Sequence, residues 1–197
     1  MAFRYLSVLL AAGFLSASAP AFAQNMLNEG ELVTSLQQLE TAATSISAAS
    51  LRQQAQASVQ SDRHANAVGR PPLSPDLATL RQLWVEIDFA FNSAAIQPKS
   101  FRTVGMMADA LHHPYLLQYK FLVIGHTDAT GGRKYNLELS QRRADAVRDA
   151  LVTVFRVSPD RVQAVGLGEE QLRDPAHPDA AVNRRVQLIN IGKVRGR

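Results

Sequence analysis

The clearest hydrophobic patterns lie in the second half of the chain. The stretch WVEIDFAFN (84–92) alternates apolar and polar positions, as a half-buried strand does. The run YKFLVIG (119–125) is continuously apolar and predicts a second strand, and RVQAVGLG (161–168) and NRRVQLINI (183–191) predict two more. Four strands are therefore expected after residue 83.

Two stretches between these strands have helical periodicity. The first opens at Pro98 and ends at Pro114, and the second spans about residues 135–155. Their apolar faces are Phe101, Val104, Ala108 and Leu111 in the first helix, and Leu139, Val147, Leu151 and Phe155 in the second. The order βαβαββ predicts an α/β (α+β) fold, a two-layer sandwich of helices on a sheet.

Arg143 interrupts the apolar stripe of the second helix. It lies halfway between Leu139 and Val147, whereas its neighbour Arg142 lies on the outer side and is expected to be solvated. Burying a guanidinium group without a partner costs several kcal/mol. Arg143 is therefore expected to face a carboxylate, water or an acidic ligand.

Asp128 is the expected counterpart of Arg143. It follows the strand at 119–125, and ligands of α/β sheets gather at the carboxyl ends of strands, near helix N-termini. A carboxylate and a guanidinium group that frame one cavity suit a zwitterion with an ammonium and a carboxylate group. Alternatively, Asp128 and Arg143 pair with each other and hold the turn. The pattern leaves both interpretations open.

The last predicted strand adds a third charge. Arg184 shares the parity of Val186, so alternation predicts that Arg184 points to the buried side and Arg185 outward. Arg184 is then expected either to bind the same ligand or to pair with a carboxylate in the core.

The N-terminus has the pattern of a signal peptide. Arg4 precedes an apolar stretch at 5–19, and AFA (21–23) is a small-x-small cleavage site before Gln24. The apolar run is short for a membrane span, which needs about 20 apolar residues. We expect export with cleavage, and a retained membrane anchor is the alternative.

Residues 26–60 have the composition of a helix, rich in Ala, Gln, Ser and Leu. A heptad-like seam runs along it through Leu32, Leu36, Leu39, Ala43 and Ile46. This pattern predicts either a helix that docks on an envelope partner or on a second copy of itself, or a solvated spacer. The chain is thus divided into a signal peptide (1–23), a helical segment (24–60), a linker (61–83), a folded domain (84–192) and a basic tail (193–197).

The composition excludes several classes of function. The chain has no cysteine, which excludes disulfides, thiol chemistry and the lipid-bearing cysteine of a lipoprotein. Its net charge of +4 is small and spread out, so no nucleic-acid partner is expected. The five histidines are scattered and no G-x-S-x-G motif occurs. We predict no enzyme activity, no metal and no cofactor, and a structural role for His126.

Five blocks in fixed order resemble one known family. They are F-x-F-N-S (89–93), GHTD (125–128), N-x-x-LS-x-x-RA-x-x-V (136–147), GLGE (166–169) and NRRV (183–186). Together they resemble the OmpA-like peptidoglycan-binding domain, which OmpA shares with the lipoprotein Pal and the flagellar stator protein MotB. The resemblance covers about residues 84–192. The segment DPAHPDAAV (174–182), just before NRRV, departs from the family's pattern.

The resemblance implies a ligand and the residues that bind it. The family binds the peptide stem of peptidoglycan, chiefly through meso-diaminopimelate, which is a zwitterion at its free end. The family's ligand contacts carry over to Asp128, Arg143, Asn136, Arg184 and Asn92, with Thr127 and Leu139 lining the site.

The expected function is non-covalent binding of peptidoglycan by a periplasmic protein of the cell envelope, with association to the outer membrane as one possibility. The first alternative is a membrane-anchored stator or secretion-system component with a MotB-like wall-binding domain. A hydrolase acting on the cell wall is the less favoured one, because no catalytic cluster is evident.

Overall fold

The computed structural model describes residues 29–37, 46–61, 70–80 and 82–194. Their main elements are, in order, α1 (Glu29–Gln37), α2 (Ala48–Ser61), α3 (Pro75–Thr79), β1 (Gln82–Val85), α4 (Phe101–His112), β2 (Tyr119–His126), α5 (Arg133–Asp149), β3 (Val162–Gly168) and β4 (Val186–Lys193). Short 3-10 turns lie at Pro98–Ser100, Pro114–Leu116, Pro159–Arg161 and Ala181–Asn183, and a π-helical turn (Ala150–Val154) continues α5.

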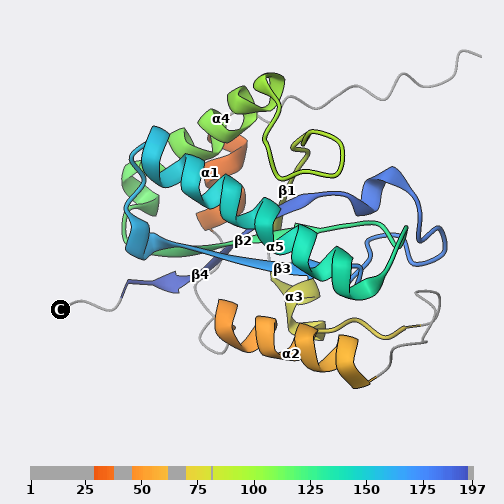
Figure 1. The fold of residues 1–197 in the computed structure, drawn as a ribbon. Coiled ribbons are helices and arrows are strands. Elements are labelled where there is room, and N and C mark those ends of the chain that lie inside the picture. The colour runs from red at the N-terminus through yellow and green to blue at the C-terminus, as the bar shows by residue number, and fades with distance from the viewer. Residues whose placement is uncertain (1–28, 38–45, 62–69, 81, 195–197) are drawn as a thin grey trace, which may run out of the picture.

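The four strands form one mixed sheet in the order β1-β4-β2-β3. β2 and β3 run parallel, and β4 lies antiparallel to both β1 and β2. Helices α4 and α5 cover one face of this sheet (Figure 1). The predicted βαβαββ order and the α/β class are confirmed.

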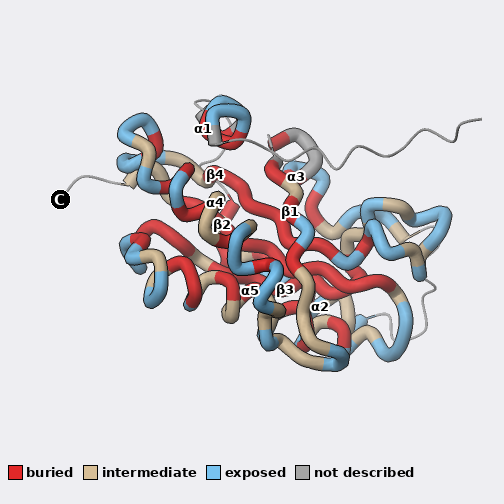
Figure 2. Tube along the Cα trace, turned by 90° about the horizontal axis from the view of Figure 1, so that it is seen from above, coloured by how far each residue is buried: buried red, intermediate tan, exposed pale blue. Residues whose placement is uncertain are grey.

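Both faces of the sheet are buried. On β2, Phe121 and Val123 pack into a core with α1, α4 and α5, whereas Leu122 and Ile124 pack into a second core beneath α2 and α3. Figure 1 shows α2 and α3 as a layer on the opposite side of the sheet from α4 and α5. Figure 2 shows the buried residues concentrated along the strands and the exposed residues in the loops. Burial on two sides explains why the β2 sequence is continuously apolar rather than alternating.

The described part of residues 26–60 forms two helices that pack on the sheet. Leu32 and Leu36 of the predicted seam are buried in the core with α4, whereas Ile46 belongs to the second core with Leu51 of α2. These seam residues are therefore buried within the chain and are not a solvated spacer, and docking of this segment on an envelope partner or on a second copy stays a prediction. The other seam positions, Leu39 and Ala43, lie outside the described residues.

The segment 61–83, expected to be a linker, contributes structure in the part that is described. It contains α3 and the first residues of β1, and Leu77 and Leu80 are buried in the second core. The predicted signal peptide (1–23) lies outside the described residues. None of the helices in the described ranges is long and apolar enough to span a membrane.

The first strand is shorter than its alternation predicts. β1 ends at Val85, and the chain then folds back on itself so that Phe89 bridges Ile96 and the Ala90 amide donates to the Ala95 carbonyl at 2.9 Å. Phe91 at the tip is fully exposed. The alternating residues 86–92 therefore form a hairpin-like loop, because their backbone pairs locally instead of with β4.

Helix α5 approaches the sheet closely at two glycines. A Cβ atom on Gly166 of β3 would lie 2.1 Å from the backbone nitrogen of Gln141, and one on Gly125 of β2 would lie 2.3 Å from the Ser140 carbonyl oxygen. Only residues without a side chain allow this contact. It holds the middle of α5, at Ser140 and Gln141, directly against β2 and β3.

His126 lies in the interior at the end of β2. Its Nε2 is 2.9 Å from Gln187 Oε1 on β4, and the ring is buried. Burial lowers the pKa of His126 well below its usual value, and the nearby Arg185 lowers it further, against the opposing hydrogen bond to Gln187. The imidazole is therefore neutral in the folded protein at neutral pH.

This burial predicts a loss of stability in acid. Below about pH 6.5 the unfolded state binds a proton at His126 that the folded state does not, so the free energy of unfolding falls with pH, by up to about 1.4 kcal/mol per pH unit. Urea unfolding of wild type and His126→Asn between about pH 7.5 and about pH 5 measures this slope. We expect a shallower slope in the variant. Equal slopes would contradict the assignment to His126.

Candidate functional site

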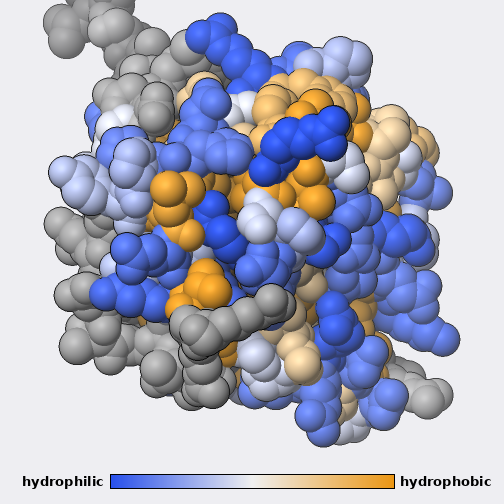
Figure 3. Space-filling model, turned by 90° about the vertical axis from the view of Figure 1, so that its left-hand side faces the viewer, coloured by the Kyte–Doolittle hydropathy of each residue, from blue (hydrophilic) through white to orange (hydrophobic). Residues whose placement is uncertain are grey.

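The predicted site residues gather at one end of the sheet. The loop after β2, the segment before β4 and the N-terminus of α5 meet there, at the right-hand end of the molecule in Figure 1. The opposite end, which faces the viewer in Figure 3, is mostly hydrophilic with separate hydrophobic patches. This location agrees with the rule that ligands bind at the carboxyl ends of strands.

Asp128 is held in place by the loop that carries it. Its Oδ1 accepts a hydrogen bond from the Thr130 amide at 3.0 Å, and its Oδ2 accepts one from Arg184 Nη1 at 2.7 Å. The side chain of Asp128 is 13% exposed and that of Arg184 is 51% exposed. The carboxylate is thus largely buried and has one guanidinium partner, which comes from the segment before β4.

Arg143 lies beside this pair and is not joined to it. Its Nε donates to the Ser93 carbonyl at 3.1 Å, and its guanidinium carbon is 4.9 Å from the centroid of the Phe89 ring. The ion pairs among the described residues do not include Arg143. The alternative in which Asp128 and Arg143 pair and hold the turn is therefore wrong.

The electrostatic environment of Arg143 favours an added negative charge. Burial lowers the pKa of Arg143; Tyr135 and Asp128 raise it, while Arg184 lowers it further. An arginine keeps its charge under such conditions. A half-buried guanidinium group without a carboxylate partner in the described protein is stabilised by a carboxylate that a ligand brings. Arg142, one residue earlier, is exposed as expected.

Asn136 and Thr127 lie beneath the surface of the site. The Asn136 amide donates to the Asp128 carbonyl (3.3 Å), the Thr130 carbonyl (3.2 Å) and Glu169 Oε2 (2.7 Å). Thr127 is buried, and its backbone nitrogen donates to the Gly168 carbonyl at 3.0 Å. Both residues shape the loop that presents Asp128. Leu139 is buried as well, one turn before Arg143 on α5.

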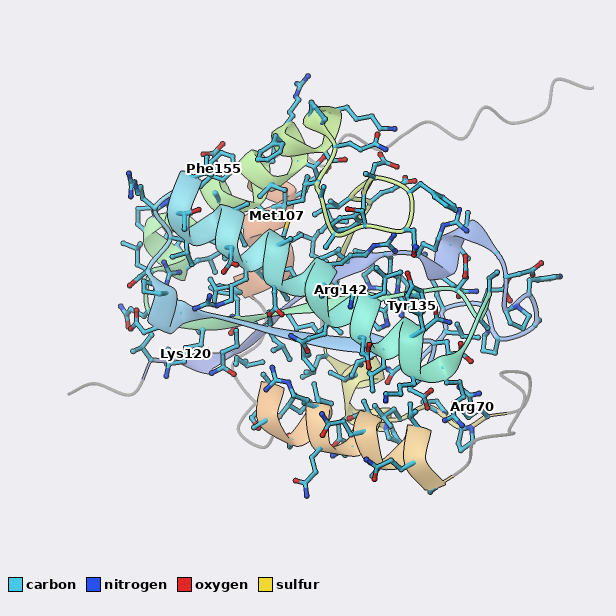
Figure 4. The ribbon with its side chains drawn as sticks, viewed as in Figure 1. Arg70, Met107, Lys120, Tyr135, Arg142 and Phe155 are labelled. Carbon is cyan, nitrogen blue, oxygen red and sulfur yellow. The ribbon has the colours of Figure 1, made fainter. Side chains whose placement is uncertain are left out.

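Asn92 reaches the site from the loop after β1. It has a left-handed backbone conformation with φ of 52°, and its Oδ1 accepts a hydrogen bond from the Tyr135 hydroxyl. Tyr135 stands on the first turn of α5, where Figure 4 labels it. The sequence provides no signal for Tyr135, because an aromatic residue at a helix start is ordinarily assigned to packing. Its contact with Asn92 depends on a loop 43 residues earlier in the chain.

The predicted orientation of the two arginines before β4 is wrong. Arg185 is 8% exposed, whereas Arg184 reaches the surface. The Arg185 guanidinium carbon is 5.0 Å from the centroid of the Trp84 ring, and Arg185 Nη2 donates to the Gln171 carbonyl at 3.0 Å. Burial lowers the pKa of Arg185 to about 10, and the neighbouring Arg173 contributes. Alternation does not predict these two orientations because both arginines precede β4, which begins at Val186, and Arg185 packs against Trp84 and Gln171 instead.

The site therefore offers one carboxylate and two guanidinium groups on one surface. Asp128 can accept from an ammonium group, and Arg143 and Arg184 can donate to carboxylates. In the described ranges, no group of three or more His, Asp or Glu side chains is arranged to hold a metal ion. This arrangement suits the binding of a small ligand that carries both signs of charge.

Comparison with known proteins agrees with this architecture. Residues 88–185 match the OmpA family. Outer membrane porin F of Pseudomonas aeruginosa is 36% identical over 118 residues, which are 57% of this chain and 32% of the porin. The peptidoglycan-associated lipoprotein of Legionella pneumophila is 35% identical over 104 residues, which are 51% of this chain and 57% of the lipoprotein.

Among solved structures, the peptidoglycan-associated lipoprotein from Burkholderia pseudomallei is 33% identical, with a TM-score of 0.43. The similarity covers 58% of this chain and 92% of that one. The matched part of this chain spans less than two thirds of the length of porin F and of the Legionella lipoprotein. The five sequence blocks, the order of the elements and the family match agree, and this chain contains a domain of the OmpA family.

Proposed function

We propose that this protein binds peptidoglycan non-covalently through the zwitterionic end of meso-diaminopimelate. The observation that carries the proposal is the guanidinium group of Arg143, oriented by the Ser93 carbonyl and left without an ion pair among the described residues, beside the carboxylate of Asp128. In this proposal Asp128 accepts from the ligand's ammonium group, and Arg143 donates to its carboxylate.

Arg184 and Asn92 complete the proposed contacts. Arg184 already holds one oxygen of Asp128 and is half exposed, so it can also donate to a ligand. Asn92 and Tyr135 close the side of the site towards the loop after β1. Asn136, Thr127 and Leu139 are proposed to act from beneath, by shaping the loop and the helix that carry the charged groups.

A role in the cell envelope follows from the same proposal. One relative is named for its association with peptidoglycan and another for the outer membrane, which supports a location where the cell wall is accessible. We propose a non-catalytic tether in the periplasm. The stator or secretion alternative depends on whether residues 1–23 remain as an anchor, and these residues lie outside the described ranges.

Co-sedimentation with two kinds of peptidoglycan tests this function. Lysine-type stems lack the carboxylate that diaminopimelate carries at the corresponding end, so they provide no partner for Arg143. We expect the purified protein to sediment with diaminopimelate-type sacculi and to bind lysine-type sacculi roughly tenfold more weakly or worse. Equal binding to both kinds of sacculi would refute recognition of the zwitterionic end of diaminopimelate. Binding to neither would refute peptidoglycan binding altogether.

A further inference from the structure

A buried cluster of charges joins the N-terminal segment to the candidate site. We call it the glutamate cluster, and it consists of Ser58, Arg70, Arg133, Glu169 and Glu170. The side chains of Glu169 and Glu170 are 5% and 1% exposed, and those of Arg70 and Arg133 are 10% and 9% exposed. Ser58 and Arg70 precede residues 88–185, which match the OmpA family, and the other three lie within them.

Glu170 receives its partners from both parts of the chain. Arg133 of α5 donates to it twice, from Nη2 to Oε2 at 2.6 Å and from Nε to Oε1 at 3.0 Å. Arg70 Nη1 donates to Oε1 at 3.2 Å, and the Ser58 hydroxyl of α2 donates to Oε2 at 2.6 Å. Two of these three residues therefore come from the N-terminal segment.

Glu169 connects the cluster to the loop that carries Asp128. Its Oε1 pairs with Arg70 Nη2 at 3.5 Å, and its Oε2 accepts from the Asn136 amide at 2.7 Å. The same amide group of Asn136 donates to the backbone carbonyls of Asp128 and Thr130. A continuous route of polar contacts thus runs from Arg70 through Glu169 and Asn136 to the Asp128 loop.

The position of Arg70 agrees with this route. Figure 4 shows Arg70 between the C-terminal end of α2 and the start of α5. Arg133, which shares Glu170 with it, is the first residue of α5 and directly follows the glycines of the Asp128 loop. The cluster is therefore attached to both ends of the loop, through Asn136 and through Arg133.

The charges of the cluster explain why Arg70 matters. Two adjacent carboxylates are buried, and two guanidinium groups face them. Breaking a buried ion pair by removing one partner leaves the other charge without compensation, which is strongly unfavourable. Without Arg70, Glu169 keeps the hydrogen bond from the Asn136 amide but loses its guanidinium partner, so its carboxylate is drawn towards water. The amide that holds the Asp128 loop then loses its fixed acceptor.

We infer that Arg70 is a positioning residue for the ligand site. The N-terminal segment then belongs to the ligand-binding unit, and a force or partner that detaches it would loosen the Asp128 loop. This inference rests on the proposed function only for its effect on affinity, because its effect on the loop can be measured without ligand.

Full-length variants test the inference. Arg70→Ala is expected to speed amide hydrogen exchange in residues 127–132 roughly tenfold and to weaken binding of a diaminopimelate muropeptide roughly fivefold to tenfold. Arg70→Lys keeps the positive charge, so we expect its hydrogen exchange in residues 127–132 and its muropeptide affinity to lie between those of wild type and Arg70→Ala. Arg52→Ala is the matched control, because it removes the same group from α2, where Arg52 Nη2 donates to the Ala164 carbonyl at 3.0 Å, away from the cluster. It is expected to change neither readout.

Two outcomes would overturn the inference. One is wild-type exchange of residues 127–132 in folded Arg70→Ala, and the other is equal acceleration in Arg52→Ala, which would indicate general loosening. If Arg70→Ala does not fold, Ser58→Ala removes one hydrogen bond to Glu170 and is expected to speed exchange in the same residues by a smaller factor. Failure of wild type to bind the muropeptide would count against the proposed function. The hydrogen-exchange comparison would still decide whether Arg70 positions the Asp128 loop.

Discussion

Replacing Arg143 with alanine is expected to weaken binding of a diaminopimelate muropeptide by about 2 kcal/mol, or roughly thirtyfold. The guanidinium group is half-buried and is oriented by the Ser93 carbonyl and the Phe89 ring, so its geometry is set before a ligand arrives. Its charge is not matched by a carboxylate in the described protein. A ligand carboxylate therefore forms a charge-assisted hydrogen bond without displacing an existing ion pair. Isothermal titration calorimetry measures the affinity.

Arg142→Ala is the matched control for this prediction. It removes the same charge from the adjacent residue, which lies exposed on the outer side of α5, as Figure 4 shows. We expect its affinity to stay within about 0.5 kcal/mol of wild type. Equal losses in the two variants would show that net charge, rather than the position of Arg143, governs binding, and would contradict the site.

Replacing Gly166 with alanine is expected to destabilise the fold by about 3 kcal/mol or more. The new Cβ atom would lie 2.1 Å from the backbone nitrogen and 2.5 Å from the Cα atom of Gln141. Backbone atoms cannot rotate away as a side chain does, so α5 must shift off β3. Because α5 carries Arg143, the same shift is expected to weaken ligand binding. Urea unfolding measures the change in stability.

Gly132→Ala provides the comparison. No atom lies within 4 Å of a Cβ atom built there, and its φ of −95° is accessible to alanine. We expect its free energy of unfolding to change by no more than about 1 kcal/mol. A Gly166→Ala protein as stable as Gly132→Ala would show that α5 is not held against the sheet as closely as the structure indicates.

The helical stripe separated two adjacent arginines correctly. Periodicity places Arg143 in line with Leu139 and Val147, and the structure has Arg143 half-buried and Arg142 exposed. This distinction was accessible from the sequence because a helix repeats its faces every 3.6 residues, so a single misplaced charge stands out. The partner of Arg143 was not accessible in the same way. In the structure Asp128 forms its ion pair with Arg184, which lies 56 residues later in the chain.

Burial of both faces of the sheet limits what alternation predicts about a strand. Alternation assigns one face of a strand to the core and the other to water, and here the second face is covered by α2 and α3. Arg185, predicted to point outward, is buried against Trp84 and the Gln171 carbonyl. Of the seam residues in the N-terminal segment, Leu32 and Leu36 are buried in the core with α4, and Ile46 is buried in the core beneath α2 and α3.

The amino-acid sequence by itself determined the order of the elements, the stripe on which Arg143 lies and the five blocks of the OmpA family, because each depends on residues close together in the chain. The tertiary structure decided which charges meet. The pairing of Asp128 with Arg184, the contact of Tyr135 with Asn92 and the cluster around Glu170 join segments 43 to 112 residues apart. Such contacts depend on how the helices and loops pack around the sheet, and no local pattern contains that information.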